Sequence, residues 1–146
     1  MLKGLQEGKF AYNHSRKVNM RISVKLIQHD LLEDKKQILL ETNALYDGNT
    51  LRYCEGDNGG VHQVYFGDNL ISFERKADVH TKITLYDNKD GESTVDSQYG
   101  KMYMQTRLCH AEKCDEYWSV EYQLLSNDEV ILHQKLYWEF TPIKNI

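Results

Sequence analysis

The chain has 146 residues, of which 40% are hydrophobic and 27% are charged, and its formal net charge is −4. A chain of this length is most simply one globular domain with one hydrophobic core. The acidic balance argues against sequence-independent nucleic-acid binding, which needs clustered lysine and arginine to neutralise phosphates.

The sequence also shows no pattern typical of a transmembrane helix, a signal peptide or a disulfide framework. No run approaches the roughly 18 apolar residues of a transmembrane helix, and the first ten residues hold no apolar signal-peptide region. Three cysteines are an odd number and poor material for a disulfide framework. We therefore expect a cytoplasmic protein with no membrane or nucleic-acid partner, and the oligomeric state stays open.

Residues 1–19 show neither the helix nor the strand period, and we interpret them as a flexible extension. The barrel domain is expected to occupy residues 20–146. From Arg21 onward, apolar and polar residues alternate, which is typical of half-buried strands. Turn residues, mainly Gly, Asn and Asp, separate the alternating segments at intervals typical of a sandwich or barrel.

This pattern predicts ten strands. They are Arg21–Leu26, Gln37–Tyr46, Leu51–Glu55, Val61–Phe66, Leu70–Lys76, Thr81–Tyr86, Ser93–Gln98, Lys101–Cys109, Tyr117–Leu125 and Val130–Thr141. Leu31–Leu40 is the best helix candidate, and it is short; His110–Asp115 is expected to be a polar connection. Because an open sheet of ten antiparallel strands would leave long unpaired edges, a closed all-β barrel of about 8–10 strands is favoured.

Three segments carry a family resemblance: Val95–Thr106, which contains the corner Tyr99-Gly100, the pattern Tyr53-x-Glu55, and Arg75-Lys76-Ala77. Together they resemble the YwiB-like family of small bacterial proteins of unknown function, over about residues 21–140. The resemblance implies a single antiparallel, up-and-down, calycin-like (lipocalin-like) β-barrel and implies no reaction. Val95, Ser97 and Ala77 depart from the family pattern.

The alternation places a polar cluster inside the barrel. Tyr53, Glu55, Arg75, Thr106 and Tyr122 all fall on inward-facing positions of their strands. An unpaired buried guanidinium is too costly to be incidental, so Arg75 should have an acidic partner, and Glu55 is the nearest by strand parity.

Two interpretations of this cluster stay open. Arg75 and the tyrosines could anchor a small polar or anionic ligand in a pocket in the barrel interior, because a guanidinium fork suits carboxylate or phosphate. Alternatively, the barrel is filled and the pair is structural. A pocket would fit a small-molecule-binding barrel or an enzyme that uses the Tyr/Glu/Arg cluster. A filled barrel would fit a protein interaction module.

Catalytic, metal and cofactor motifs are weak. Cys109-His110-x3-Cys114 offers at most three ligands without a second ligand pair, so no metal site is expected there. Asp87–Gly91 is a turn whose spacing fails as a calcium loop. The six histidines are spread over separate elements, and no nucleophile motif or phosphate-binding loop is present. No cofactor is expected.

Overall fold

The structure is a computed structural model that describes residues 20–57 and 59–143. Ten strands follow one another in the chain. They are β1 (Met20–Asp30), β2 (Lys35–Tyr46), β3 (Thr50–Cys54), β4 (Val61–Phe66), β5 (Leu70–Lys76), β6 (His80–Tyr86), β7 (Gly91–Ser97), β8 (Gly100–Lys113), β9 (Tyr117–Ser126) and β10 (Glu129–Pro142). The expected extension, residues 1–19, lies outside the described residues.

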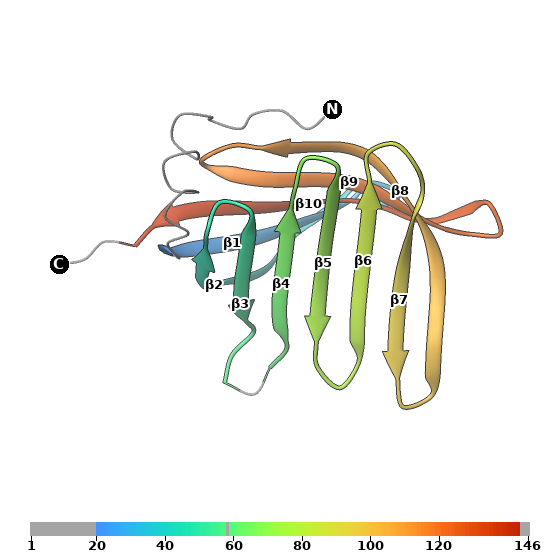
Figure 1. Cartoon of the computed structure of the whole chain (residues 1–146), viewed down its shortest axis with the longest axis horizontal. Helices are drawn as coiled ribbons and strands as arrows, with labels where there is room; N and C mark the ends of the chain where they lie inside the picture. Colours follow the sequence, from blue (N-terminus) through green and yellow to red (C-terminus); the bar gives the residue numbers. More distant parts are fainter. Residues whose placement is uncertain (1–19, 58, 144–146) are drawn as a thin grey trace.

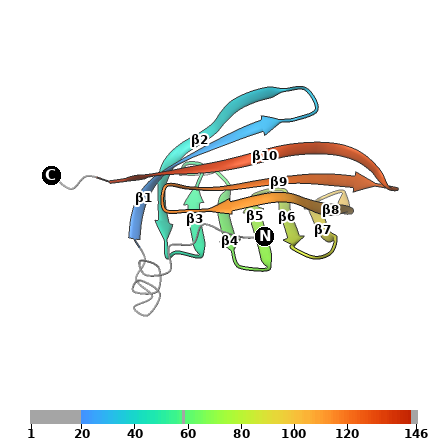
Figure 2. The same cartoon turned by 90° about the horizontal axis from the view of Figure 1, so that it is seen from above.

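Each strand pairs antiparallel with its neighbour in the chain, and β1 also pairs with β10, so the sheet closes into a barrel. The predicted all-β barrel is therefore confirmed. The barrel is flattened: β3 to β7 lie side by side as one layer, and β1, β9 and β10 cross them as the other (Figure 1). Seen from above, the β1–β2 hairpin extends beyond the layers (Figure 2).

Aromatic side chains fill the space between the layers. Trp118 is fully buried and packs against Tyr46, Phe66 and Phe140, with ring centroids 5.3–5.6 Å apart. Such rings bury large apolar areas and dominate core energetics. This part of the barrel is a packed core.

A lysine also lies in this core. The Nζ atom of Lys113 donates to Asn49 Oδ1 and to the carbonyl oxygen of Phe66, each at 2.8 Å. Burial lowers the pKa of Lys113 to about 8, because a low-dielectric site disfavours the ammonium. Two hydrogen bonds compensate only part of this cost.

Two sequence predictions are corrected. The polar connection expected over His110–Asp115 is largely strand, because β8 continues to Lys113. Leu31–Leu40 forms the turn of the β1–β2 hairpin and the start of β2, so it is not a helix.

Tyr99-Gly100 joins β7 to β8, with Gly100 at a φ of 119°, a conformation that favours glycine. Within the described residues no helix could span a membrane.

Candidate functional site

A row of side chains crosses the inner face of β3, β4 and β5 near one end of these strands. Tyr53 lies opposite His62 in the register, and His62 lies opposite Arg75. Tyr53 and His62 stack with ring centroids 4.6 Å apart and an interplanar angle of 12°. Register therefore gathers a phenol, an imidazole and a guanidinium from three strands.

Glu55, just beyond the end of β3, binds this row. Arg75 donates from Nε to Glu55 Oε2 at 2.5 Å and from Nη2 to Oε1 at 3.0 Å. His62 Nε2 donates to the same Oε2 at 2.5 Å. This bidentate geometry is the strongest form of an arginine–carboxylate pair. We call Tyr53, Glu55, His62 and Arg75 the rim cluster.

The predicted Arg75–Glu55 pair therefore forms, but its expected burial is wrong. The side chains of Arg75 and Glu55 are 39% and 28% exposed. Glu55 follows the end of β3 and Arg75 is near the end of β5, and both strands end at the lower edge of the front layer in Figure 1. Because solvent reaches the pair, the desolvation cost that motivated the prediction is small.

The loop between β3 and β4 positions this pair. The backbone N–H of Glu55 donates to the carbonyl of Gly60 at 2.9 Å, and the N–H of Gly60 approaches Glu55 Oε1 at 3.4 Å. A Cβ at Gly60 would lie 2.9 Å from Arg75 Nε. A larger residue at position 60 would therefore require the guanidinium of Arg75 to shift.

The electrostatics of the rim cluster follow from these contacts. The hydrogen bond from Arg75 is the main cause that lowers the pKa of Glu55 to about 2, with His62 adding to it. Hydrogen bonding to Glu55 raises the pKa of Arg75. Burial raises the pKa of Tyr53 to about 12, and the Tyr53 hydroxyl accepts a hydrogen bond from Trp138 Nε1 at 3.0 Å. The cluster is a neutralised ion pair beside a neutral phenol.

The other two predicted site residues lie elsewhere in the barrel. Tyr122 is 1% exposed, and its hydroxyl accepts a hydrogen bond from Gln134 Nε2. Thr106 is fully buried and donates to the carbonyl of Thr84 at 2.7 Å. Both hydroxyls are engaged in the core and are not part of the rim cluster.

His62 was not among the predicted site residues. On β4 it alternates in step with Val64 and Phe66, which are 1% and 0% exposed. The same parity argument that placed Arg75 inward would have placed His62 inward as well.

Next to the rim cluster, the barrel wall is open along one seam. β2 and β3 pair only over Ala44↔Tyr53, Leu45↔Arg52 and Tyr46↔Leu51, whereas β1 and β2 pair along nearly their full length. Where β2 and β3 separate, a solvent-open depression of about 690 Å³ forms, which we call the seam depression. Its lining is Arg21, Thr42, Asn43, Ala44, Leu45, Arg52, Tyr53, Cys54, Gly56, Asp57 and Val61.

Two arginines give the seam depression its charge. Arg21 and Arg52 lie on either side of Leu45 in the register of β1, β2 and β3, on the outer face of the barrel. Among residues 20–57 and 59–143, neither arginine forms an ion pair. Asp57 is the acidic residue of the lining. The depression meets the rim cluster at Tyr53 and at the loop that carries Glu55.

Comparisons with known proteins identify the fold. No protein-family model matches the chain, and no curated protein matches it. Among solved structures, the YwiB protein from Bacillus subtilis is similar, with a TM-score of 0.55 and 14% sequence identity. The match covers 83% of this chain and 90% of that one. At this identity the similarity concerns the fold, a closed antiparallel barrel.

Proposed function

We propose that this barrel binds a small anionic molecule in the seam depression. The supporting observation is the pair of arginines that line it, neither of which forms an ion pair with an acidic residue among 20–57 and 59–143. A volume of about 690 Å³ is within the range of small-molecule sites, roughly 300–1,000 Å³. A guanidinium presents forked donors that match carboxylate and phosphate oxygens.

The spacing of the two arginines suits one anion. Their strands are separated by β2, so their Cα atoms are about 10 Å apart if each neighbouring pair is spaced by roughly 4.8 Å. Arginine side chains are long enough to converge on one group across that span. Leu45 lies between them and is 42% exposed, which offers an apolar floor to the ligand.

In this proposal the rim cluster supports one wall of the site, and Tyr53 is its member that lines the depression. Arg75 is already neutralised by Glu55, so it is a poor anchor for an anion, in contrast to Arg52. Its role is to hold the loop with Gly56 and Asp57, which line the depression. Of the predicted ligand-binding residues, Tyr53 lines the proposed site, Glu55 and Arg75 support its loop from outside the lining, and Tyr122 and Thr106 serve the core.

The contacts favour binding over acid–base catalysis at the rim cluster. Glu55, His62 and Arg75 do converge within hydrogen-bonding distance, as an enzyme would require. However, the Glu55 pKa of about 2 makes this carboxylate a weak base at neutral pH, far from the value that general-base catalysis favours.

Titration calorimetry with inorganic phosphate and with citrate tests the proposal. We expect the wild-type protein to bind at least one of them, with an affinity that falls as salt is added. Replacing both Arg21 and Arg52 by glutamine should weaken binding by more than about tenfold, because a hydrogen bond to a charged group contributes roughly 1.5–3 kcal/mol.

Arg107→Gln is the matched control. Arg107 is also exposed on a strand, but it is paired with Asp90, at 3.3 Å from Nε to Oδ1. Its substitution should leave anion binding unchanged. Equal binding by the wild type and the Arg21/Arg52 double variant, or no binding of either anion by the wild type, would reject the proposal.

A further inference from the structure

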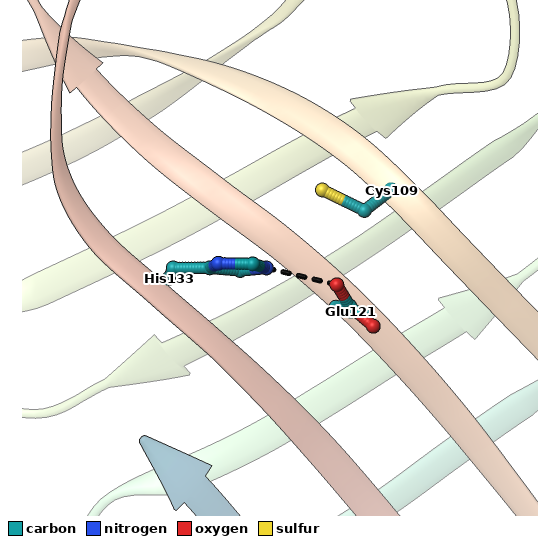
Figure 3. Close-up of side chains that lie close together, drawn as sticks. All are labelled: Cys109, Glu121 and His133. Atoms are coloured by element: carbon teal, nitrogen blue, oxygen red, sulfur yellow. Dashed lines mark hydrogen bonds and ion pairs between the residues drawn. The ribbon is translucent and has the colours of Figure 1, made fainter. Parts of the chain in front are cut away.

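Three side chains with metal-ligating atoms meet on the outer wall, where β8, β9 and β10 run side by side. They are Cys109, Glu121 and His133, and their ligand atoms all lie within 4.8 Å of one another (Figure 3). This group is separate from both the rim cluster and the seam depression.

A β-bulge places Cys109 in this group. The pairing of β8 with β9 runs from Leu108↔Tyr122 directly to His110↔Glu121, so Cys109 has no partner in the register. Leu108 and Ala111 both pack in the core, which leaves the intervening Cys109 and His110 on the outer face. Bulges commonly re-aim a side chain in this way.

The other two residues are held toward each other. Glu121 lies between Val120 and Tyr122, which are 0% and 1% exposed, so its own side chain is directed outward. His133 Nε2 is 2.8 Å from Glu121 Oε2. The side chains of Glu121 and His133 are 30% and 24% exposed, and Cys109 is exposed, so an ion in solvent can reach all three.

We propose that Cys109, Glu121 and His133 form a binding site for Zn²⁺. Thiolate sulfur, imidazole nitrogen and carboxylate oxygen are the ligands that zinc uses, at about 2.3, 2.0–2.1 and 2.0–2.2 Å respectively. In a tetrahedron with such bonds the ligand atoms are about 3.3–3.7 Å apart. The largest separation in the present group, up to 4.8 Å, therefore needs to shorten by about 1 Å, whereas His133 Nε2 and Glu121 Oε2, now 2.8 Å apart, need to separate by about 0.5 Å. Because the side chains are partly exposed, rotation about their own bonds can supply this shift.

Three protein ligands leave the fourth zinc position to water or to a donor atom of a bound molecule. This coordination is typical of catalytic zinc sites, whereas structural sites fill all four positions with protein ligands. Metal binding would replace the His133–Glu121 hydrogen bond and release the thiol proton of Cys109 to solvent.

Titration of the reduced full-length protein with Zn²⁺, in competition with a chromophoric chelator, tests the site. We expect one ion per chain. Cys109→Ser should weaken binding by more than about tenfold, since even an outer-shell partner contributes roughly 10–100-fold to affinity. His133→Gln should weaken it similarly. Both side chains lie on the outer wall, and circular dichroism would verify that the variants are folded.

Co²⁺ adds a readout that is specific to the ligand type, because a coordinated thiolate produces a sulfur-to-cobalt charge-transfer band in the near ultraviolet. The band should be lost in Cys109→Ser and kept in the control variants Cys54→Ser, Cys114→Ser and His110→Gln. His110 is the most stringent control because it shares the bulge but contacts Glu112 instead. Failure of the wild type to bind one ion, or a band that survives Cys109→Ser, would overturn the assignment.

Discussion

Gly60 lies directly over the guanidinium of Arg75, so that a Cβ at this position would come within 2.9 Å of Nε and 3.2 Å of Cζ. Gly60→Ala should therefore displace a side chain that two hydrogen bonds to Glu55 hold in place. We expect a loss of about 1–3 kcal/mol in the free energy of unfolding, the usual cost of overpacking. Urea denaturation measures it.

A double-mutant cycle identifies the source of this loss. In an Arg75→Ala background the obstacle to a Cβ is gone, so Gly60→Ala should cost less than about 0.5 kcal/mol there. If Gly60→Ala costs the same in both backgrounds, the backbone of the loop, and not Arg75, requires glycine.

Acid should weaken the rim cluster through Glu55. Its folded-state pKa of about 2 lies below its ordinary value of 4.5, so the pair contributes stability above pH 4.5 that is lost as the pH falls toward 2. Since the pair is partly exposed, we expect its contribution at pH 7 to be only about 0.2–1 kcal/mol. Comparing unfolding free energies of the wild type and Glu55→Gln between pH 7 and pH 3 tests this.

The difference between wild type and Glu55→Gln should shrink steadily through this acid range. Asp57→Asn, in the same loop, is the control. It keeps the Glu55–Arg75 contact, so its unfolding free energy should show the same acid-dependent loss from this contact as that of the wild type. A Glu55→Gln effect that is constant from pH 7 to pH 3 would contradict the assignment of the stabilising charge to Glu55.

The rim cluster and the seam depression show what sequence patterns can predict and what they cannot. Alternation is local, so the strand that carries Arg75 and the partner Glu55 followed from parity alone. The location of the pair at the rim, in contrast, depends on how the barrel is flattened and on which strands cross, and these are set by contacts distant in sequence. The seam beside Arg52 results from the short pairing of β2 with β3, which no local pattern encodes.

The bulge at Cys109 explains the main error in the strand assignment. An extra residue breaks the period-2 pattern, so two successive outward polar residues, Cys109 and His110, resemble the start of a loop. The same break concealed the meeting of Cys109 with Glu121 and His133, which lie 12 and 24 residues further along the chain. His62 differs, because its position two residues before the buried Val64 on β4 already marks it as inward-facing in the sequence.

Tyr122 and Thr106 should affect stability without affecting anion binding. Tyr122→Phe leaves Gln134 without its acceptor in a buried site, and Thr106→Val removes the donor to the carbonyl of Thr84. Each should cost about 1–3 kcal/mol, since a buried polar group loses its partner. Denaturation and phosphate or citrate titration of the same variants separate the two effects. Weakened anion binding in a folded Tyr122→Phe variant would place the ligand in the barrel core instead.

Lys113 should make the protein more stable as the pH rises from about 8 to about 10.5. Its pKa of about 8 is below the ordinary 10.5, so in this interval the folded state releases a proton that the unfolded state keeps, and stability rises with pH. Over this interval the unfolding free energy of the wild type should rise by up to about 3 kcal/mol relative to that of Lys113→Met, since each pKa unit corresponds to about 1.4 kcal/mol.

Comparison with Lys113→Met isolates this lysine from the tyrosines and cysteines that also titrate in alkali. Lys101→Met is the matched control, because Lys101 is 51% exposed beside Asp96. That variant should follow the wild type across the interval. Parallel pH profiles for the wild type and Lys113→Met would mean that the hydrogen bonds to Asn49 and Phe66 keep the buried ammonium charged, with its pKa near the ordinary value.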